Sequence, residues 1–304
     1  MRTRLRHSRA GYRRLVQMSS VSLVILVEGS SDVYCYSRLV AAAALPTQIE
    51  VRPAKDLPGG TGGKAKLLAY FRYLRRANSL CSTLGGKRTA VMFFLDKDVD
   101  DILRKRLRSP HLVYTDGYDM ESYLYRFGDV PNAVAALIQQ NPAAVTAVIP
   151  GDWTVIAAEA WRHWIHLCLL ARVINVNVAT NYSVSSQINA PCDAACDHVR
   201  YVARREAIRA ATGLDVASFA RIVRRLERTI VVRYQSGLHH TVFRGKWYAV
   251  FLRHWVSALT ARTFSEEELS AILAASLPYD APWSRQIRTR IGDVAQRCGL
   301  LPAA

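Results

Sequence analysis

Four aspartates lie directly after an apolar run, VMFFL, and within six residues of one another. They are Asp96, Asp98, Asp100 and Asp101, in a chain that has 24 acidic residues against 41 lysines and arginines. Two carboxylates about 5 Å apart repel by roughly 3 kcal/mol at an effective dielectric constant near 20. If these side chains converge, protonation or a bound cation must offset that cost.

A second pair of acids, Glu28 and Asp32, follows another apolar run, LVILV. Gly29 lies between them and allows a tight turn after the run. Carboxylate oxygens on a rigid scaffold favour Mg²⁺ or Mn²⁺ over Zn²⁺. We therefore predict a metal site from the two acidic segments. The predicted ligands are Glu28, Asp32, Asp96 and Asp98. The remaining pair, Asp100 and Asp101, is expected to cap and start a helix.

A helix cap is the simpler interpretation of any single acid after a strand. The complete pattern, EGxxD after one run and DxD after another, favours the metal site instead. Because the chain carries a formal net charge of +17, a hard cation in it suggests a phosphate-containing substrate. Such a cation would polarise the phosphoryl group, activate water, or do both.

The elements that must position these acids alternate between strand-like and helix-like segments. Strands are expected at 22–27, 47–52, 89–95 and 111–114, and helices at 31–44, 64–78 and 100–107. This alternation predicts a mostly parallel sheet. Functional groups gather at the carboxyl edge of such a sheet, so the acids converge if the first and third strands are neighbours.

The second half of the chain shows helical periodicity instead. Helices are expected at 132–140, 153–174, 197–211, 216–232, 246–261 and 265–276. The predicted class is therefore α/β, with a mostly parallel sheet flanked by helices and a mainly helical C-terminal region. The predicted regions are a basic segment (1–20), a catalytic domain (21–130) and a basic helical region that completes the site and binds substrate or a partner (131–304). Charged residues interrupt the apolar stretch 153–175, so we interpret it as a buried amphipathic helix and expect no membrane span.

The basic residues comprise 34 arginines and 7 lysines. Arginine is suited to bidentate phosphate contacts, so the charge favours nucleic acid, RNA or DNA, as the partner. A GC-rich coding sequence is the competing explanation of the arginine excess.

The six cysteines show no disulfide-like spacing, which favours free thiols and a cytoplasmic location. Cys192, Cys196 and His198 lack a second ligand cluster, so we expect structural thiols there and no zinc. His239 and His240 are expected on the surface. The Arg-rich first 17 residues fit a basic helix, a targeting segment, or an extension that precedes a true start at Met18.

The segments VILVEGSSD and FFLDKD resemble the Toprim fold, which forms the catalytic core of topoisomerases, bacterial primases and OLD-family nucleases. The resemblance covers about residues 20–125. It implies that Glu28 acts as acid/base or metal ligand and that Asp96 and Asp98 bind Mg²⁺. Asp32 would be a further ligand of the OLD-like kind. Relatives of this kind commonly dimerise, so the resemblance also implies a homodimer.

Two later segments, LVYTDGYDMESYLY at 112–125 and FRGKWY at 243–248, resemble an OLD-like Toprim family of unknown function. One branch of that family supplies the AriB nuclease subunit of the PARIS anti-phage system. There an ABC-type ATPase partner restrains the nuclease until infection, and the activated nuclease attacks tRNA. By this resemblance Glu121 completes the metal site and Lys246 contacts the scissile phosphate. The plainer alternatives are a helix residue and a helix-start cation.

The loop GGTGGKA at 59–65 departs from a Walker A motif, because Pro58 and Ala65 stand where that motif needs Gly and Ser or Thr. Its lysines, Lys64 and Lys66, open a helix and could hold a substrate phosphate. The other alternative is a flexible connection. The predicted substrate contacts are Gly29, Lys64, Lys66 and Lys97.

The leading hypothesis is thus a Mg²⁺- or Mn²⁺-dependent nuclease, acting as a toxic effector in anti-phage defence. A topoisomerase or primase is disfavoured, because the chain is short and shows no zinc module. The alternative from another class is a non-catalytic Toprim module that binds nucleic acid or a regulatory ATPase.

Overall fold

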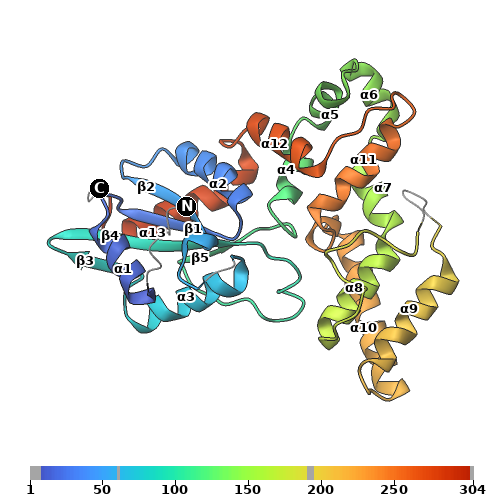
Figure 1. Ribbon diagram of the computed structural model, residues 1–304, viewed down its shortest axis with the longest axis horizontal. Coiled ribbons are helices and arrows are strands. Elements are labelled where there is room, and N and C mark those ends of the chain that lie inside the picture. Colours follow the sequence, from blue (N-terminus) through green and yellow to red (C-terminus); the bar gives the residue numbers. More distant parts are fainter. Residues whose placement is uncertain (1–7, 60–61, 190–194, 302–304) are drawn as a thin grey trace, which may run out of the picture. The chain divides into compact units, whose positions relative to one another are not determined.

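The computed structural model describes residues 8–59, 62–189 and 195–301. The chain divides into two compact units (Figure 1). The sheet unit contains residues 8–96, 106–115 and 278–301, and the helical unit contains 97–105 and 116–277. The chain therefore passes between the units several times, whereas the sequence suggested consecutive regions.

The sheet unit contains five strands, and its class is the α/β class that the sequence predicts. The strands are β1 (Leu23–Val27), β2 (Ile49–Pro53), β3 (Cys81–Leu84), β4 (Lys87–Leu95) and β5 (Leu112–Tyr114). β1 pairs in parallel with β2 on one side and with β4 on the other. β5 also runs parallel to β4, at its carboxyl end, while β3 runs antiparallel to the start of β4. The sheet is thus mostly parallel, with β1 and β4 as the expected neighbours.

β3 was not predicted, although its hairpin signal is present in the sequence. The turn between β3 and β4 is Gly85-Gly86, and both glycines have positive φ angles, 55° and 78°. A two-residue connection of this kind matches the twist of paired strands and requires residues that tolerate positive φ.

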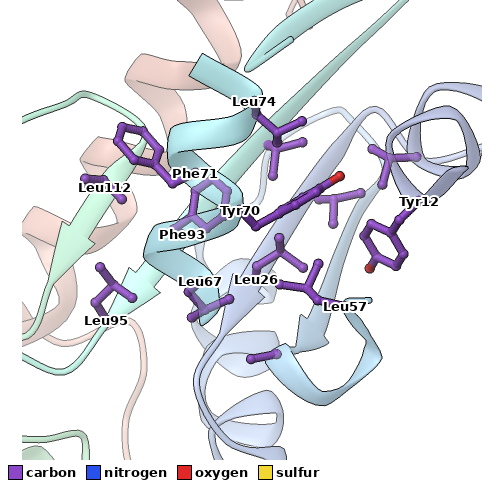
Figure 2. Close-up of a cluster of buried hydrophobic side chains, with 14 of the residues drawn as sticks. Tyr12, Leu26, Leu57, Leu67, Tyr70, Phe71, Leu74, Phe93, Leu95 and Leu112 are labelled. Atoms are coloured by element: carbon purple, nitrogen blue, oxygen red, sulfur yellow. The ribbon is translucent and has the colours of Figure 1, made fainter. Parts of the chain in front are cut away.

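Helices cover both faces of this sheet (Figure 1). They are α1 (Arg9–Met18), α2 (Ser30–Ala43), α3 (Lys64–Arg76) and α13 (Arg285–Arg297). α1 and α3 pack on the face that carries Leu26 and Phe93 (Figure 2). α2 lies on the other face, where Tyr36 contacts Phe94 at a ring-centroid distance of 4.7 Å, and α13 packs against α2. Because both faces are covered, β1 is buried along its whole length, which explains its continuous apolar sequence.

The N-terminal helix is part of the folded core. Tyr12 and Val16 of α1 are each 3% exposed, and the Tyr12 ring meets Tyr70 of α3 edge-on at 5.7 Å (Figure 2). The basic helix expected near the N-terminus is thus confirmed over α1, and residues 1–7 lie outside the described part.

The helical unit is built from nine α-helices within its described residues. They are α4 (Glu121–Phe127), α5 (Val130–Ile138), α6 (Pro142–Val148), α7 (Trp153–Ala160), α8 (Arg162–Ile174), α9 (His198–Ala210), α10 (Val216–Gln235), α11 (Tyr248–Val256) and α12 (Glu266–Ser276). The single helix expected at 153–174 is wrong, because the chain breaks at Trp161 between α7 and α8. Trp161 is buried against Trp247 and Phe251, so packing of this ring takes precedence over helix continuity there.

Two features of this unit follow from the local sequence. The buried face of α10 consists of Phe219, Val223, Leu226 and Ile230. Ser265 and Glu268 form a capping box at the start of α12, with bonds of 2.7 and 3.1 Å. In the described part of the chain, no helix is both long and apolar enough to cross a membrane.

The prediction of free thiols is wrong for Cys81 and Cys298, which form a disulfide across 217 residues. The return of α13 to the sheet brings them together, and sequence spacing gives no sign of that contact. Cys35, Cys168 and Cys196 are not in disulfides, and Cys192 lies outside the described residues.

Candidate functional site

The carboxylate of Glu28 joins the ends of β1 and β4. Glu28 follows β1 directly, and its Oε1 accepts the backbone N–H of Asp96, the residue after β4, at 2.9 Å. The structure therefore brings Glu28 and Asp96 together at the carboxyl edge, as expected for neighbouring parallel strands. From this edge β1 continues through α2 to β2, on the side away from β4, and β4 continues to β5, on the side away from β1. Such a switch point is where open α/β sheets bind ligands.

Asp32 holds the turn that follows Glu28. Its Oδ2 accepts the backbone N–H of Gly29 at 2.7 Å, so Asp32 caps the start of α2. The N-cap residue is Gly29. Gly29 has extended backbone angles, and a Cβ there would lie 3.2 Å from the Asp32 carboxylate. Glycine thus permits a close approach of the carboxylate at this position.

Gly62, in the described part of the Gly-rich loop before α3, lies against the same edge, whereas residues 60–61 of the loop lie outside the described residues. A Cβ on Gly62 would lie 3.3 Å from the backbone oxygen of Glu28, and Gly63 has a positive φ of 97° as the N-cap of α3. The ammonium group of Lys64, the first residue of α3, donates to the backbone oxygen of Asp96. Burial lowers the pKa of Lys66, and Asp56 opposes that shift. The positive N-terminal end of α3 and the Lys64 ammonium group thus lie at the acidic edge.

The segment after Asp96 belongs to the helical unit and differs from the prediction. Asp98 has a positive φ of 49°, and its N–H donates to the Tyr118 carbonyl at 2.7 Å. The Lys97 side chain is buried, and its ammonium group donates a hydrogen bond to the Asp116 carbonyl. This bond links the segment after Asp96 to the segment that contains Asp116.

The helix expected at 100–107 is absent, because residues 98–104 form successive turns. Asp100 is buried, and Asp101 pairs with Arg233 of α10 at 2.7 Å. The helix-capping role expected for these two acids is therefore wrong. The Asp101 carboxylate instead forms a tertiary ion pair, which the local sequence does not reveal.

Glu121 and Lys246, which the resemblance singled out separately, form an ion pair within the helical unit. The Lys246 Nζ lies 3.2 Å from Oε1 of Glu121, the first residue of α4, and 3.2 Å from Oε1 of Glu266, the first residue of α12. Burial lowers the pKa of Lys246, but the two carboxylates outweigh it, so the pKa is raised overall. Lys246 is thus held as a cation between two acids.

A buried acid, Asp119, connects the two segments that carry this ion pair. Asp119 accepts the Ser122 N–H at 2.9 Å and the Gly245 N–H at 3.1 Å. Burial, together with the negative charge of Glu121, raises the pKa of Asp119 to about 8. A Cβ at position 245 would lie 2.4 Å from the Ser122 nitrogen, so only glycine fits there.

A basic groove runs along α10 in the helical unit. It is lined by Lys97, Asp101, Asp116, Arg225, Arg228, Thr229, Val232, Arg233, Leu238, His240 and Thr241. Arg225 and Arg228 are exposed. The cations outnumber the acids in this lining, which suits a phosphate backbone.

His239 and His240 are buried, so the prediction of surface histidines is wrong. Burial lowers the pKa of His239 to about 4 and that of His240 to about 3, and Arg126 adds to both shifts. Both rings are therefore neutral near pH 7 and form part of the packing beside the groove.

Sequence reasoning missed two acids of the helical unit, Asp119 and Glu266. Asp119 lies inside the quoted segment YTDGYDMES, but its burial is set by contacts with Gly245, far along the chain. Glu266 belongs to the SEEE segment that caps α12, and nothing in that segment indicates its contact with Lys246.

The described residues contain one group of at least three side chains whose ligand atoms lie within 4.8 Å of one another, and it is Cys81, His111 and Cys298. Within the sheet unit, the described carboxylates of Glu28, Asp32 and Asp96 do not form such a group. The chain matches no protein-family model and no curated protein.

Proposed function

We propose that the protein is a Mg²⁺- or Mn²⁺-dependent nuclease that hydrolyses phosphodiester bonds in nucleic acid. The bond from the Asp96 N–H to the Glu28 carboxylate carries this proposal, because it fixes an acid at the carboxyl edge where β1 and β4 meet. Asp32 lies one helical turn beyond Glu28, and Asp98 lies two residues beyond Asp96.

The donor set fits a hard divalent ion, since Glu28, Asp32, Asp96 and Asp98 all offer carboxylate oxygens. The bound ion would polarise the phosphodiester and stabilise charge on its oxygens. Glu28 would orient or deprotonate the attacking water. Lys64 and the N-terminus of α3 would bind the substrate phosphate, because both present positive charge at this edge. Lys246 would serve as a second phosphate contact.

The basic groove along α10 and the net charge of +17 support a nucleic-acid substrate. The resemblance to OLD-like Toprim proteins supports the narrower proposal of a toxic anti-phage effector that acts on tRNA. It also supports an ABC-type ATPase partner and a homodimer. These narrower proposals rest on the resemblance alone.

The decisive experiment is cleavage of labelled bulk tRNA and of supercoiled plasmid with Mg²⁺, Mn²⁺ or a chelator. Cutting should need the metal, and Glu28→Gln should lower the rate by about 100-fold or more, as expected for loss of a general base or ligand. Glu227→Gln on the exposed side of α10 is the matched control and should cut normally. Equal cutting by Glu28→Gln, or cutting in the chelator, would refute the proposal.

The second candidate is a non-catalytic module that binds nucleic acid or a regulatory ATPase. Within the sheet unit, Glu28, Asp32 and Asp96 do not form a compact ligand group, and this favours the second candidate. It predicts nucleic-acid binding with no cleavage under any metal condition. It also predicts that toxicity in cells, if present, survives Glu28→Gln, whereas a nuclease restrained by a partner would lose toxicity.

A further inference from the structure

A second cluster of ligand-type side chains lies within the sheet unit, apart from the acids. Cys81 begins β3, Cys298 is the residue after α13, and His111 immediately precedes β5. Their ligand atoms all lie within 4.8 Å of one another. Three elements that are distant in sequence thus direct two sulfurs and one imidazole to a single point.

The histidine is oriented as a metal ligand would be. Its Nδ1 lies 2.8 Å from the backbone oxygen of Val91, and its Nε2 lies 3.7 Å from the Cys81 sulfur. Because a carbonyl oxygen can only accept, Nδ1 carries the proton, and Nε2 of the neutral ring presents its lone pair toward the sulfur. Metal-ligating histidines commonly fix their tautomer by this same bond to a backbone carbonyl. Burial lowers the His111 pKa, which favours the neutral ring.

The surroundings favour thiolates and give access to them. Arg88 and Arg297 line the same open pocket as Cys81 and Cys298, and neighbouring arginines stabilise the thiolate form of cysteine. Cys81 is exposed, whereas Cys298 is buried. A metal ion, a reductant or a small oxidant can therefore reach the pair from the pocket.

We propose that Cys81, His111 and Cys298 form a Zn²⁺ site when the two thiols are reduced, and that the disulfide is the oxidised, metal-free form of the same pair. Two thiolates and one imidazole are a set that Zn²⁺ prefers, and water from the pocket supplies a fourth ligand. Binding releases the two thiol protons. Oxidation of the zinc-bound pair by a disulfide-class oxidant forms the Cys81–Cys298 bond and releases Zn²⁺ to solvent. The oxidant takes up the two electrons of the thiolates and two protons from water and leaves as two thiols.

Both forms fasten the end of α13 to the start of β3. The reduced, metal-free form has neither bond at this end of α13. The proposal is independent of the nuclease assignment, because none of its residues belongs to the acidic edge.

The test uses the full-length protein, reduced with a phosphine, freed of metal by a chelator, and titrated with Co²⁺ as a spectroscopic substitute for Zn²⁺. We expect a thiolate-to-cobalt charge-transfer band that saturates at a single equivalent and disappears when Zn²⁺ is added. Oxidised protein should give no band. Cys81→Ser and Cys298→Ser should each lose half of the band or more, and His111→Ala should weaken Co²⁺ binding by about 10-fold or more.

Cys196→Ser is the matched control, because Cys196 is a partly exposed free thiol outside the cluster. It should keep the full band. Loss of the band in Cys196→Ser, an unchanged band in Cys81→Ser, or no band in the reduced wild-type protein would each overturn the proposal. Circular dichroism of every variant establishes that it is folded, and Cys81→Ser, at the exposed position, is the variant least prone to misfold.

Discussion

The carboxylate of Asp119 accepts the backbone N–H of Gly245 at 3.1 Å, across 126 residues of chain. This bond joins two short segments, YDMES and FRGKWY, that look unrelated in the sequence. Glu121 lies two residues after Asp119, Lys246 directly follows Gly245, and their ion pair follows from the same contact. The hydrogen bond between the two segments therefore positions the charged side chains of Glu121 and Lys246.

Replacing Gly245 with alanine should disrupt this contact. The new Cβ would lie 2.4 Å from the Ser122 nitrogen and 2.5 Å from Asp119 Oδ1, and neither neighbour is a flexible chain end. We expect a loss of about 1–3 kcal/mol in unfolding free energy, as for other overpacked sites, measured by urea denaturation. Gly151→Ala is the control, because no atom lies within 4 Å of its Cβ position and its φ is not positive. Equal stability of the two variants would contradict the steric argument.

Asp119 should make folding stability depend on pH. Burial, and then the charge of Glu121, raises its folded pKa from 3.8 to about 8. Between about pH 4 and about pH 8 the folded state therefore keeps a proton that the unfolded state releases. The contribution of this group to stability falls as pH rises through that window and levels off above it.

Asp119→Asn should remove this part of the pH dependence. Asparagine stays neutral, and one oxygen can still accept from both Ser122 donors and from Gly245. The variant should gain stability relative to wild type as pH rises toward about 8. Urea denaturation of both proteins across this range measures the difference. A constant difference at every pH would show that Asp119 is charged in the folded protein.

The sequence was sufficient for the parts of the fold that depend on local patterning. The buried strands β1 and β4 are continuous apolar runs, and α10 shows its buried face at helical spacing. Glu28 and Asp96 could be placed together because parallel neighbours end at one edge.

The sequence was insufficient where contacts between residues far apart in the chain determine the structure. Asp100 and Asp101 after β4 suggested a helix start, but Arg233 pairs with Asp101 and the chain forms turns there instead. Cys81 and Cys298 meet only because α13 returns to the sheet. The burial of His240 depends likewise on packing that no short window contains.

Lys246 should stabilise the helical unit through its two acidic partners. In Lys246→Met the carboxylates of Glu121 and Glu266 lose the cation that lies 3.2 Å from each. We expect a loss of about 1–3 kcal/mol, less than for a fully buried pair, and recovery of most of it in Lys246→Met/Glu121→Gln. Urea denaturation of the single and double variants gives the coupling energy between Lys246 and Glu121.

The comparison pair is Arg200 and Asp197, whose side chains are 69% and 42% exposed. The Arg200 Nε lies 3.1 Å from the Asp197 Oδ2. Arg200→Met should cost less than about 1 kcal/mol, because exposed pairs contribute little. A similar loss in both lysine and arginine variants would mean that partial burial does not strengthen the Lys246 pairs.

The groove along α10 should contact nucleic-acid phosphates through Arg225 and Arg228, two exposed arginines that line it. Each phosphate contact releases counterions, so Arg225→Ala/Arg228→Ala should weaken binding to tRNA and reduce the slope of log affinity against log salt by about 1–2. Fluorescence anisotropy with labelled tRNA over a salt series measures both quantities.

Arg221→Ala/Arg224→Ala removes the same charge from exposed positions of the same helix, outside the groove lining. If that pair weakens binding equally, the net charge of the helix is responsible and the groove is not. A larger effect of the groove pair would instead locate the nucleic-acid backbone on this face of α10.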